Sequence, residues 1–290
     1  MFTVTPPDGE SAAPTTGAPT LVRNEDMWIG TFPGLGVVQV APDGQFTVTP
    51  ANADHTESTG GEDDVEERRR ALVHGWAELL ALVRRGHRLT PGASLCPPDD
   101  PRTLLLTGDP HDVIIVLLEL SRRGWLVLSD FPAPTTWAAD QLVAHPRRAP
   151  LLMSARRAEK AHVSGTPIRR DSDAIVVALP RSEQPLPVAA LAAVRTRKTG
   201  EPVFEELTGH SRFEAATRIF FGGVLQSEDQ QAGAAALAEH LALAKLPSAR
   251  IGLDPSKPAP DAGAANQSHH PHAASIDTLL AWWDRSKVRP

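Results

Sequence analysis

The stretch TLLLTGDPHDVIIVLLELSRRGWLVLSD, residues 103–130, decides the fold. Its first residues, Thr103–Thr107, form an apolar run of strand length that ends in a Gly-Asp-Pro turn signal. Residues 111–123 are almost continuously apolar, and their length and the Asp-Pro start favour a helix. Gly124 would end that helix, and a second strand follows it. We expect a strand–helix–strand crossover between parallel strands, with the helix buried in mid-domain.

The turn Gly108-Asp109-Pro110 stands where a phosphate-binding loop would lie. Such a loop reads GxxxxGK[ST], because its glycines let backbone N–H groups wrap a phosphate while Lys and Ser/Thr bind phosphate and Mg²⁺. Here DPHDVII follows the first glycine, so the second Gly, the Lys and the Ser/Thr are missing. Asp109 is a strong N-cap, Pro110 suits the first helical position and Asp112 lies in the first turn. Two carboxylates thus occupy the positive helix end and would repel a triphosphate. The residues alone favour a well-capped helix that never bound phosphate over a degenerate loop, since short motif remnants are weak signals.

The order of elements around this turn resembles the nucleotide-binding core of HPr kinase/phosphorylase-like (P-loop, PEP-carboxykinase-like) proteins, over roughly residues 70–220. The segment Leu89–Cys96 is similar to that family's His-Gly strand, with Pro91 in the position of the His. Leu104–Asp109 resembles the strand that enters the loop, and Arg122–Asp130 resembles the acidic strand after the helix.

This resemblance implies the fold of a nucleotide enzyme without its chemistry. Only Gly108 and Asp130 match the family's functional positions, since the loop Lys, the loop Ser/Thr and the strand His are absent and Phe131 replaces a second acid. It therefore implies a pseudoenzyme with no catalytic residue, no cofactor and no metal. Gly108, Asp109 and Asp130 would be the remains of its nucleotide site.

Composition restricts the class of protein. The 290 residues are 41% hydrophobic, and no apolar run reaches the ~18 residues of a membrane-spanning helix. The first residues lack a signal-peptide pattern, and a lone cysteine, Cys96, fits a reducing compartment, so we expect a cytoplasmic protein. A net charge of −6 gives no basic footprint for nucleic acid. The preference for Arg over Lys is typical of a GC-rich bacterial genome. We expect no nucleic-acid and no membrane partner.

The chain divides into four segments by composition. Residues 1–20 are predicted to be a disordered leader, and residues 21–253 the degenerate HPr kinase-like domain. Residues 254–274 are a predicted flexible linker, and residues 275–287 a C-terminal amphipathic helix. Near the start of the domain, residues 36–50 carry a Pro-Asp-Gly turn and predict a β-hairpin.

The expected fold class is α/β with α+β character. A mixed sheet would carry the central buried helix after the degenerate P-loop, an N-terminal β-hairpin and a docking helix at the C-terminus. Further helices are predicted at Val65–Arg85, Trp137–Ala144, Phe213–Phe221 and Gln226–Leu246. Further strands are predicted at Ala174–Leu179 and Arg250–Leu253, while Val188–Arg195 reads as a strand or a short helix.

The C-terminal helix presents an apolar stripe. Ile276, Leu279, Leu280 and Trp283 lie at i, i+3, i+4 and i+7, and Trp282 adds a second tryptophan. A helix this short needs a surface to dock on. We predict that these five residues bind a partner protein in a helix-in-groove mode, or that the helix folds back on its own domain; both alternatives stay open.

Three functions are compatible with these features. The first is a non-catalytic accessory or regulatory protein that binds a protein partner. The second is a residual phosphotransferase or nucleotide-binding enzyme, with Asp130 for metal and His87, His111 or Arg122 near phosphate. The third is a small-molecule or peptide sensor that uses the old nucleotide cleft. We expect the first.

Overall fold

The fold is mixed α/β, as a computed structural model of the chain shows. The structure describes residues 3–5, 20–23, 26–32, 36–50, 75–138, 141–147, 151–154, 158–159, 166–167, 174–198, 200–217, 241–254 and 272–286. No helix within these ranges is long and apolar enough to cross a membrane.

The main sheet joins nine strands within the described residues. Seven follow one another in the spatial order β6 (Arg88–Thr90), β10 (Ala133–Ala138), β11 (Gln141–Ala144), β15 (Leu186–Thr196), β8 (Thr103–Gly108), β7 (Gly92–Cys96) and β9 (Leu126–Ser129). β17 (Ser248–Leu253) also pairs with β15, and β16 (Phe204–Leu207) pairs with β17. Because β8, β15 and β17 are parallel, their carboxyl ends meet at one edge of the sheet.

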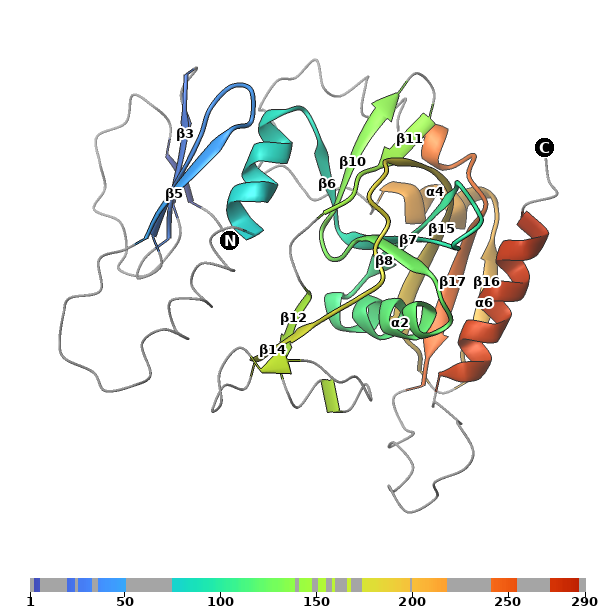
Figure 1. Cartoon of the computed structure of the whole chain (residues 1–290). Coiled ribbons are helices and arrows are strands. Elements are labelled where there is room, and N and C mark those ends of the chain that lie inside the picture. The colour runs from blue at the N-terminus through green and yellow to red at the C-terminus, as the bar shows by residue number, and fades with distance from the viewer. Residues whose placement is uncertain are drawn as a thin grey trace.

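Helices cover both faces of this sheet (Figure 1). On one face α2 (Pro110–Arg122) and α6 (Ala273–Ser286) share a single hydrophobic cluster with β8, β15 and β17. On the other face α4 (Gly209–Thr217) and the helical residues 241–243 pack over Leu105, Leu128 and Leu191. The sheet is therefore buried on both sides near its centre.

The predicted strand–helix–strand unit is present as β8, α2 and β9. The two strands run in the same direction because each is antiparallel to β7, which lies between them. Gly124, at φ +87°, follows the end of α2 as the sequence predicts. Apolar residues of α2 are buried against the sheet, among them Val113, Val116, Leu117 and Leu120.

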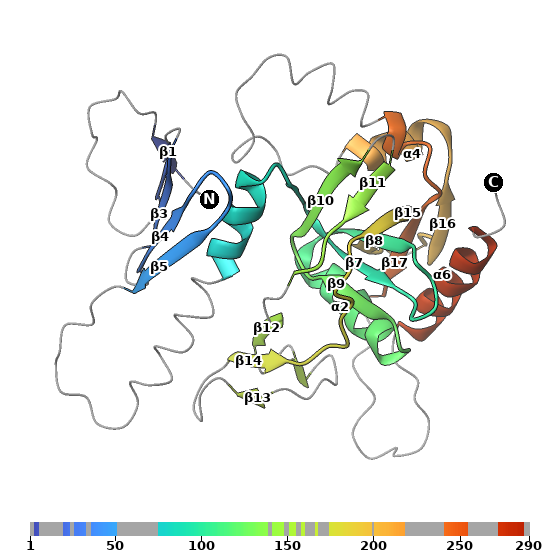
Figure 2. The ribbon, with the colours of Figure 1, turned by 45° about the horizontal axis from the view of Figure 1, so that its top comes forward.

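A second sheet lies beside the main one and has its own core (Figure 2). Its strands follow chain order: β1 (Thr3–Thr5), β2 (Thr20–Arg23), β3 (Trp28–Phe32), β4 (Gly36–Val40) and β5 (Phe46–Pro50). The predicted hairpin is β4 and β5, which pair from Gly36–Pro50 to Val40–Phe46. A helix over residues 75–84 covers one face, where Leu80 packs with Leu21, Phe32 and Val38.

Two local predictions are corrected. The predicted helix at Trp137–Ala144 is wrong, because these residues fall in the antiparallel strands β10 and β11. Strand β10 carries Thr135, Thr136 and Trp137, whose β-branched and aromatic side chains fit a pleated strand better than a helix. The single strand Leu89–Cys96 is instead divided at Pro91 into β6 and β7, in keeping with the missing N–H of proline.

Several remaining predictions are resolved. Val188–Arg195 lies in strand β15, and Arg250–Leu253 in strand β17. A small sheet that the sequence predicts only in part is formed by β12 (Leu151–Ser154), β14 (Ala174–Val177) and β13 (Thr166–Pro167). Strand β16 was not predicted. Residues 6–19, 51–74, 218–240 and 255–271 lie outside the described residues, and with them most of the predicted leader and linker, the start of the Val65 helix and most of the Gln226 helix.

Candidate functional site

Gly108 ends β8 with φ +136°, a conformation that only glycine adopts readily. A Cβ atom at this position would lie 2.1 Å from the carbonyl oxygen of Val194, its register partner on β15. The close approach of two strands therefore requires this glycine whether or not an anion binds. The residue that survives from the predicted phosphate loop has a purely structural reason to be there.

The N-terminus of α2 is closed by its own residues. Asp109 is the N-cap, and its Oδ1 accepts the backbone N–H of His111 at 2.9 Å. Pro110 at the first helical position has no N–H to offer. Pro110 therefore has no backbone N–H to donate, and the backbone N–H of His111 is already bound by Asp109. The prediction that acid and proline close this helix end is confirmed.

Asp112 lies in the first turn of α2 and is buried. Its Oδ2 accepts the backbone N–H of Thr196 at 2.6 Å, and its Oδ1 accepts the Thr196 hydroxyl at 3.0 Å. The carboxylate thus does more than complement the helix dipole, since it fastens the start of α2 to the end of β15.

Asp130, the other match to the family pattern, follows β9 and is only 5% exposed. Its Oδ1 accepts a hydrogen bond from Nη1 of Arg147 at 3.1 Å, and Nε of Arg147 lies 3.5 Å from Glu78 on the helix over residues 75–84. Burial raises the pKa of Asp130, against the opposing effect of Arg147 and Arg181. This carboxyl group therefore belongs to a buried ion pair with Arg147, which also contacts the helix over residues 75–84 through Glu78. No cluster of three or more metal-ligating side chains exists within the described ranges.

The other predicted phosphate-binding candidates are scattered. His111 is exposed on α2, and Arg122 pairs with Glu119 at 3.0 Å on the same helix. His87 lies against His145, with 4.2 Å between the ring centroids. Burial, with the charges of His145 and Arg85, lowers the pKa of His87 to about 4. These residues do not converge with Asp130 on one site.

A cavity of about 440 Å³ lies beside Gly108. The residues that line it come from the ends of β8 and β15, from β17, from α4 and from the β6–β7 junction. They are Pro91, Thr107, Gly108, Asp109, Ala193, Val194, Arg195, Glu214, Ala215 and Arg250. Asp130 is not among them, so the two residues that match the family pattern do not share this cavity.

The C-terminal helix α6 docks on its own domain. Ile276, Leu279, Trp282 and Trp283 are buried, with Trp282 2% and Trp283 1% exposed, while Leu280 is half-buried. The Trp283 ring meets the ring of Trp125 in a T-shaped arrangement at 5.4 Å. Of the two predicted alternatives, the structure contains the fold-back arrangement. The five predicted partner-binding residues face the core of this chain.

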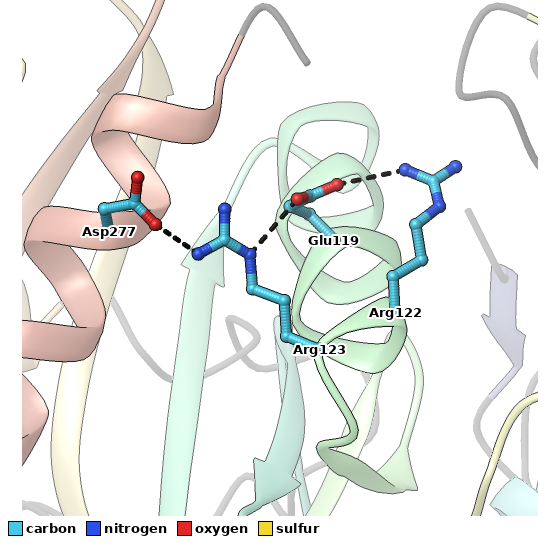
Figure 3. A network of polar contacts seen from close by, with 4 residues as sticks. All are labelled: Glu119, Arg122, Arg123 and Asp277. Carbon is cyan, nitrogen blue, oxygen red and sulfur yellow. Dashed lines mark hydrogen bonds and ion pairs between the residues drawn. The ribbon is translucent and has the colours of Figure 1, made fainter. Parts of the chain in front are cut away.

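A polar network secures the same helix to α2 (Figure 3). Arg123 reaches Asp277 on α6 with Nη1 and Glu119 on α2 with Nε, the latter at 3.2 Å. Arg122 holds the other carboxylate oxygen of Glu119, which is buried. Ser275 adds a hydrogen bond from its hydroxyl to the carbonyl of Gly252 at 3.0 Å. The docking of α6 thus combines apolar burial with defined polar contacts.

Sequence reasoning missed several residues of these arrangements, among them Thr196, Arg147, Arg195 and Arg250. Each acts through a partner distant in the chain, or through its place at the sheet edge. Strand β16, which carries the partner of Arg250, was itself not predicted. No local pattern marks such residues, because their roles depend on strand order and not on spacing.

No protein-family model matches this chain, and no curated protein sequence matches it significantly.

Proposed function

We propose that the protein is a non-catalytic accessory or regulatory protein that binds a protein partner on a scaffold similar to that of HPr kinases. The observation that carries the proposal is the internal use of Gly108, Asp109 and Asp112 at the start of α2. Gly108 packs against Val194, Asp109 caps the helix, and Asp112 holds Thr196. A group that already satisfies its own fold cannot also form a phosphate cradle without cost.

The pairing of Asp130 supports the same proposal. A carboxylate that holds the metal ion in phosphoryl transfer has to face that ion, which in turn binds the phosphate oxygens. The carboxylate of Asp130 instead meets Arg147 in a buried ion pair. Removal of Arg147 from this pair would leave a buried uncompensated charge, which is strongly unfavourable. The alternative of a residual phosphotransferase requires a rearrangement of this pair.

The N-terminal sheet has an outer face without charged residues, and this face supports the proposal of a protein partner. Side chains alternate along each strand, so the residues opposite the 75–84 helix form a single outer face. Within strands β2 to β5 these are Thr20, Val22, Ile29, Thr31, Val37, Gln39, Thr47 and Thr49. None carries a charge, and Val22 is 41% exposed. Depletion of charged side chains is typical of the centres of protein interfaces.

Nucleotide binding, which a residual phosphotransferase requires, is tested by calorimetry with Mg²⁺-ATP on the full chain. We expect no binding at micromolar concentrations, because the anion would meet Asp109 and a capped helix. Micromolar binding that is lost in Asp130→Ala would instead establish the residual nucleotide-binding enzyme.

Partner binding is tested by affinity capture with a tagged full chain and two lysine variants. Val37→Lys places a charge in the outer face, while Leu241→Lys places one at an exposed apolar residue elsewhere. We expect a protein that is recovered by the wild type and by Leu241→Lys, and lost with Val37→Lys. Recovery of nothing, or equal recovery by all three proteins, would contradict the proposal.

A further inference from the structure

One row of residues crosses the main sheet on the face opposite α2. Gly92 on β7 pairs with Thr107 on β8, and Thr107 pairs with Ala193 on β15. Ala193 pairs with Arg250 on β17, which pairs in turn with Glu205 on β16. The row thus has two small residues at Gly92 and Ala193, and an ion pair at its far end. The small side chain of Ala193 leaves room above the sheet, whereas at Gly92 the carbonyl oxygen of Leu106 already lies where a Cβ atom would be.

The cavity of about 440 Å³ occupies this room. Thr107, Ala193 and Arg250 of the row all line it, and α4 contributes Glu214 and Ala215 from the opposite side. Its volume lies in the range of small-molecule sites in proteins. It also lies at the carboxyl ends of the parallel strands β8 and β15, where open α/β sheets bind their ligands.

Two arginines, Arg195 and Arg250, are among the residues that line the cavity, and each forms an ion pair with a partly exposed acid. Nη1 of Arg250 lies 2.6 Å from Glu205, and Nη2 of Arg195 lies 3.5 Å from Glu201. Arg195 and Arg250 are diagonal neighbours on the same sheet face, since Arg195 pairs with Gly252. Ion pairs of this exposure are weak, so the guanidinium groups can turn to a ligand carboxylate at little cost.

Carboxylates also line the cavity. Asp109 comes from the turn after β8, and Glu214 comes from α4. A ligand with several negative charges would be repelled by these groups, and a simple cation would meet the two arginines. A molecule that carries one charge of each sign satisfies both sets.

We propose that this cavity binds a small zwitterion, a free α-amino acid. Its carboxylate would meet Arg195 and Arg250, and its ammonium group would meet Asp109 and Glu214. Its side chain would lie over the apolar part of the lining, which includes Ala193. This site is separate from the outer face of the N-terminal sheet, so it stands or falls independently of the proposed protein partner.

The test measures thermal unfolding of the full chain with each of the common L-amino acids at millimolar concentration. For each hit, the corresponding amine without the carboxylate and the corresponding acid without the amino group are compared. At ten times its Kd, a ligand is expected to raise the Tm by about 3 °C. We expect at least one amino acid to do so and neither singly charged analogue to match it.

Two variants test whether the ligand binds in this cavity. Ala193→Phe fills the space above the row, and Arg250→Lys keeps the charge but loses the two-pronged geometry. We expect the first to abolish the shift and the second to weaken binding at least fivefold, with native circular dichroism in both. Ala138→Leu, at an exposed strand end, is the matched control and retains the shift. The proposal is overturned if no amino acid raises the Tm, if a singly charged analogue binds equally well, or if Ala193→Phe binds as the wild type does.

Discussion

Asp112 and Thr196 hold the start of α2 to the end of β15, through hydrogen bonds of 2.6 and 3.0 Å from one threonine to one carboxylate. The two residues lie on elements far apart in the chain. Their contact fixes the helix end against the strand edge at which the candidate cavity opens. The geometry of the candidate site therefore depends on a contact between two elements that are distant in the sequence.

Removal of the Asp112 carboxylate is expected to destabilise the fold. Asp112→Ala leaves the Thr196 N–H without its acceptor and should lower the free energy of unfolding by about 2–3 kcal/mol. Thr196→Val removes only the hydroxyl and should cost about 1 kcal/mol. Urea denaturation of both single variants and the double variant measures the coupling. Strict additivity of the two effects would show that the hydrogen bond from the Thr196 hydroxyl to the carboxylate contributes nothing.

Substitution of Gly108 is expected to cost far more than substitution of another glycine in the left-handed region. Gly108→Ala would place a methyl group 2.1 Å from the Val194 carbonyl oxygen, and β8 and β15 would have to separate. Gly124→Ala has φ +87° but meets nothing within 4 Å, so it should cost only about 1 kcal/mol of strain. Thermal unfolding compares the two. Equal losses of stability would contradict the close-approach explanation.

The buried pair of Asp130 and Arg147 should respond differently to single and double substitution. Asp130→Ala leaves buried Arg147 with only its longer contact of 3.5 Å to Glu78, and is expected to cost about 3 kcal/mol. The double variant Asp130→Ala with Arg147→Met removes both charges and should recover much of that loss. Guanidinium chloride denaturation measures both free energies. A double variant no more stable than Asp130→Ala would show that the charge of Arg147 is not the cause.

Mild acid is expected to destabilise the protein through His87. The unfolded chain protonates this histidine near pH 6.5, whereas the native state resists protonation until about pH 4. Its contribution to stability is therefore complete above the unfolded pKa and is lost as the pH falls from about 6.5 towards 4. The lowered pKa of half-buried His145 acts in the same direction.

His87→Phe isolates this effect because it keeps a ring beside His145 and removes the titrating group. Urea unfolding at about pH 7.5 and about pH 5 should show a smaller loss in this variant than in the wild type. An unchanged pH dependence would exclude His87 as its source.

Docking of α6 should depend on its tryptophans far more than on its exposed ion pair. Trp283→Ala removes a fully buried ring that packs on Trp125, and is expected to cost about 3–5 kcal/mol. Asp277 is 66% exposed, so Asp277→Asn should cost less than about 1 kcal/mol despite its contact with Arg123. Differential scanning calorimetry compares the two variants. A larger loss of stability from Asp277→Asn than from Trp283→Ala would contradict the expectation that apolar burial dominates the docking of α6.

Sequence reasoning predicted the elements whose signals are local. The apolar run before Gly108, the Asp109-Pro110 start of α2 and the stripe of α6 are such signals, and each element is present. The segment Trp137–Ala144 was predicted wrongly because an isolated short stretch gives no view of the strands it pairs with. The role of Arg147 was hidden for the same reason, since its partners Asp130 and Glu78 are brought together only by the fold.

The position of α6 also bears on how the chain is synthesised. The sheet and α2 leave the ribosome well before Ala273–Ser286, yet the same hydrophobic cluster is complete only when Trp282 and Trp283 have joined it. Until then part of the apolar surface beside Trp125 lacks its final cover. During translation this surface is a natural target for a chaperone, and an arrested or prematurely ended chain would emerge prone to aggregation.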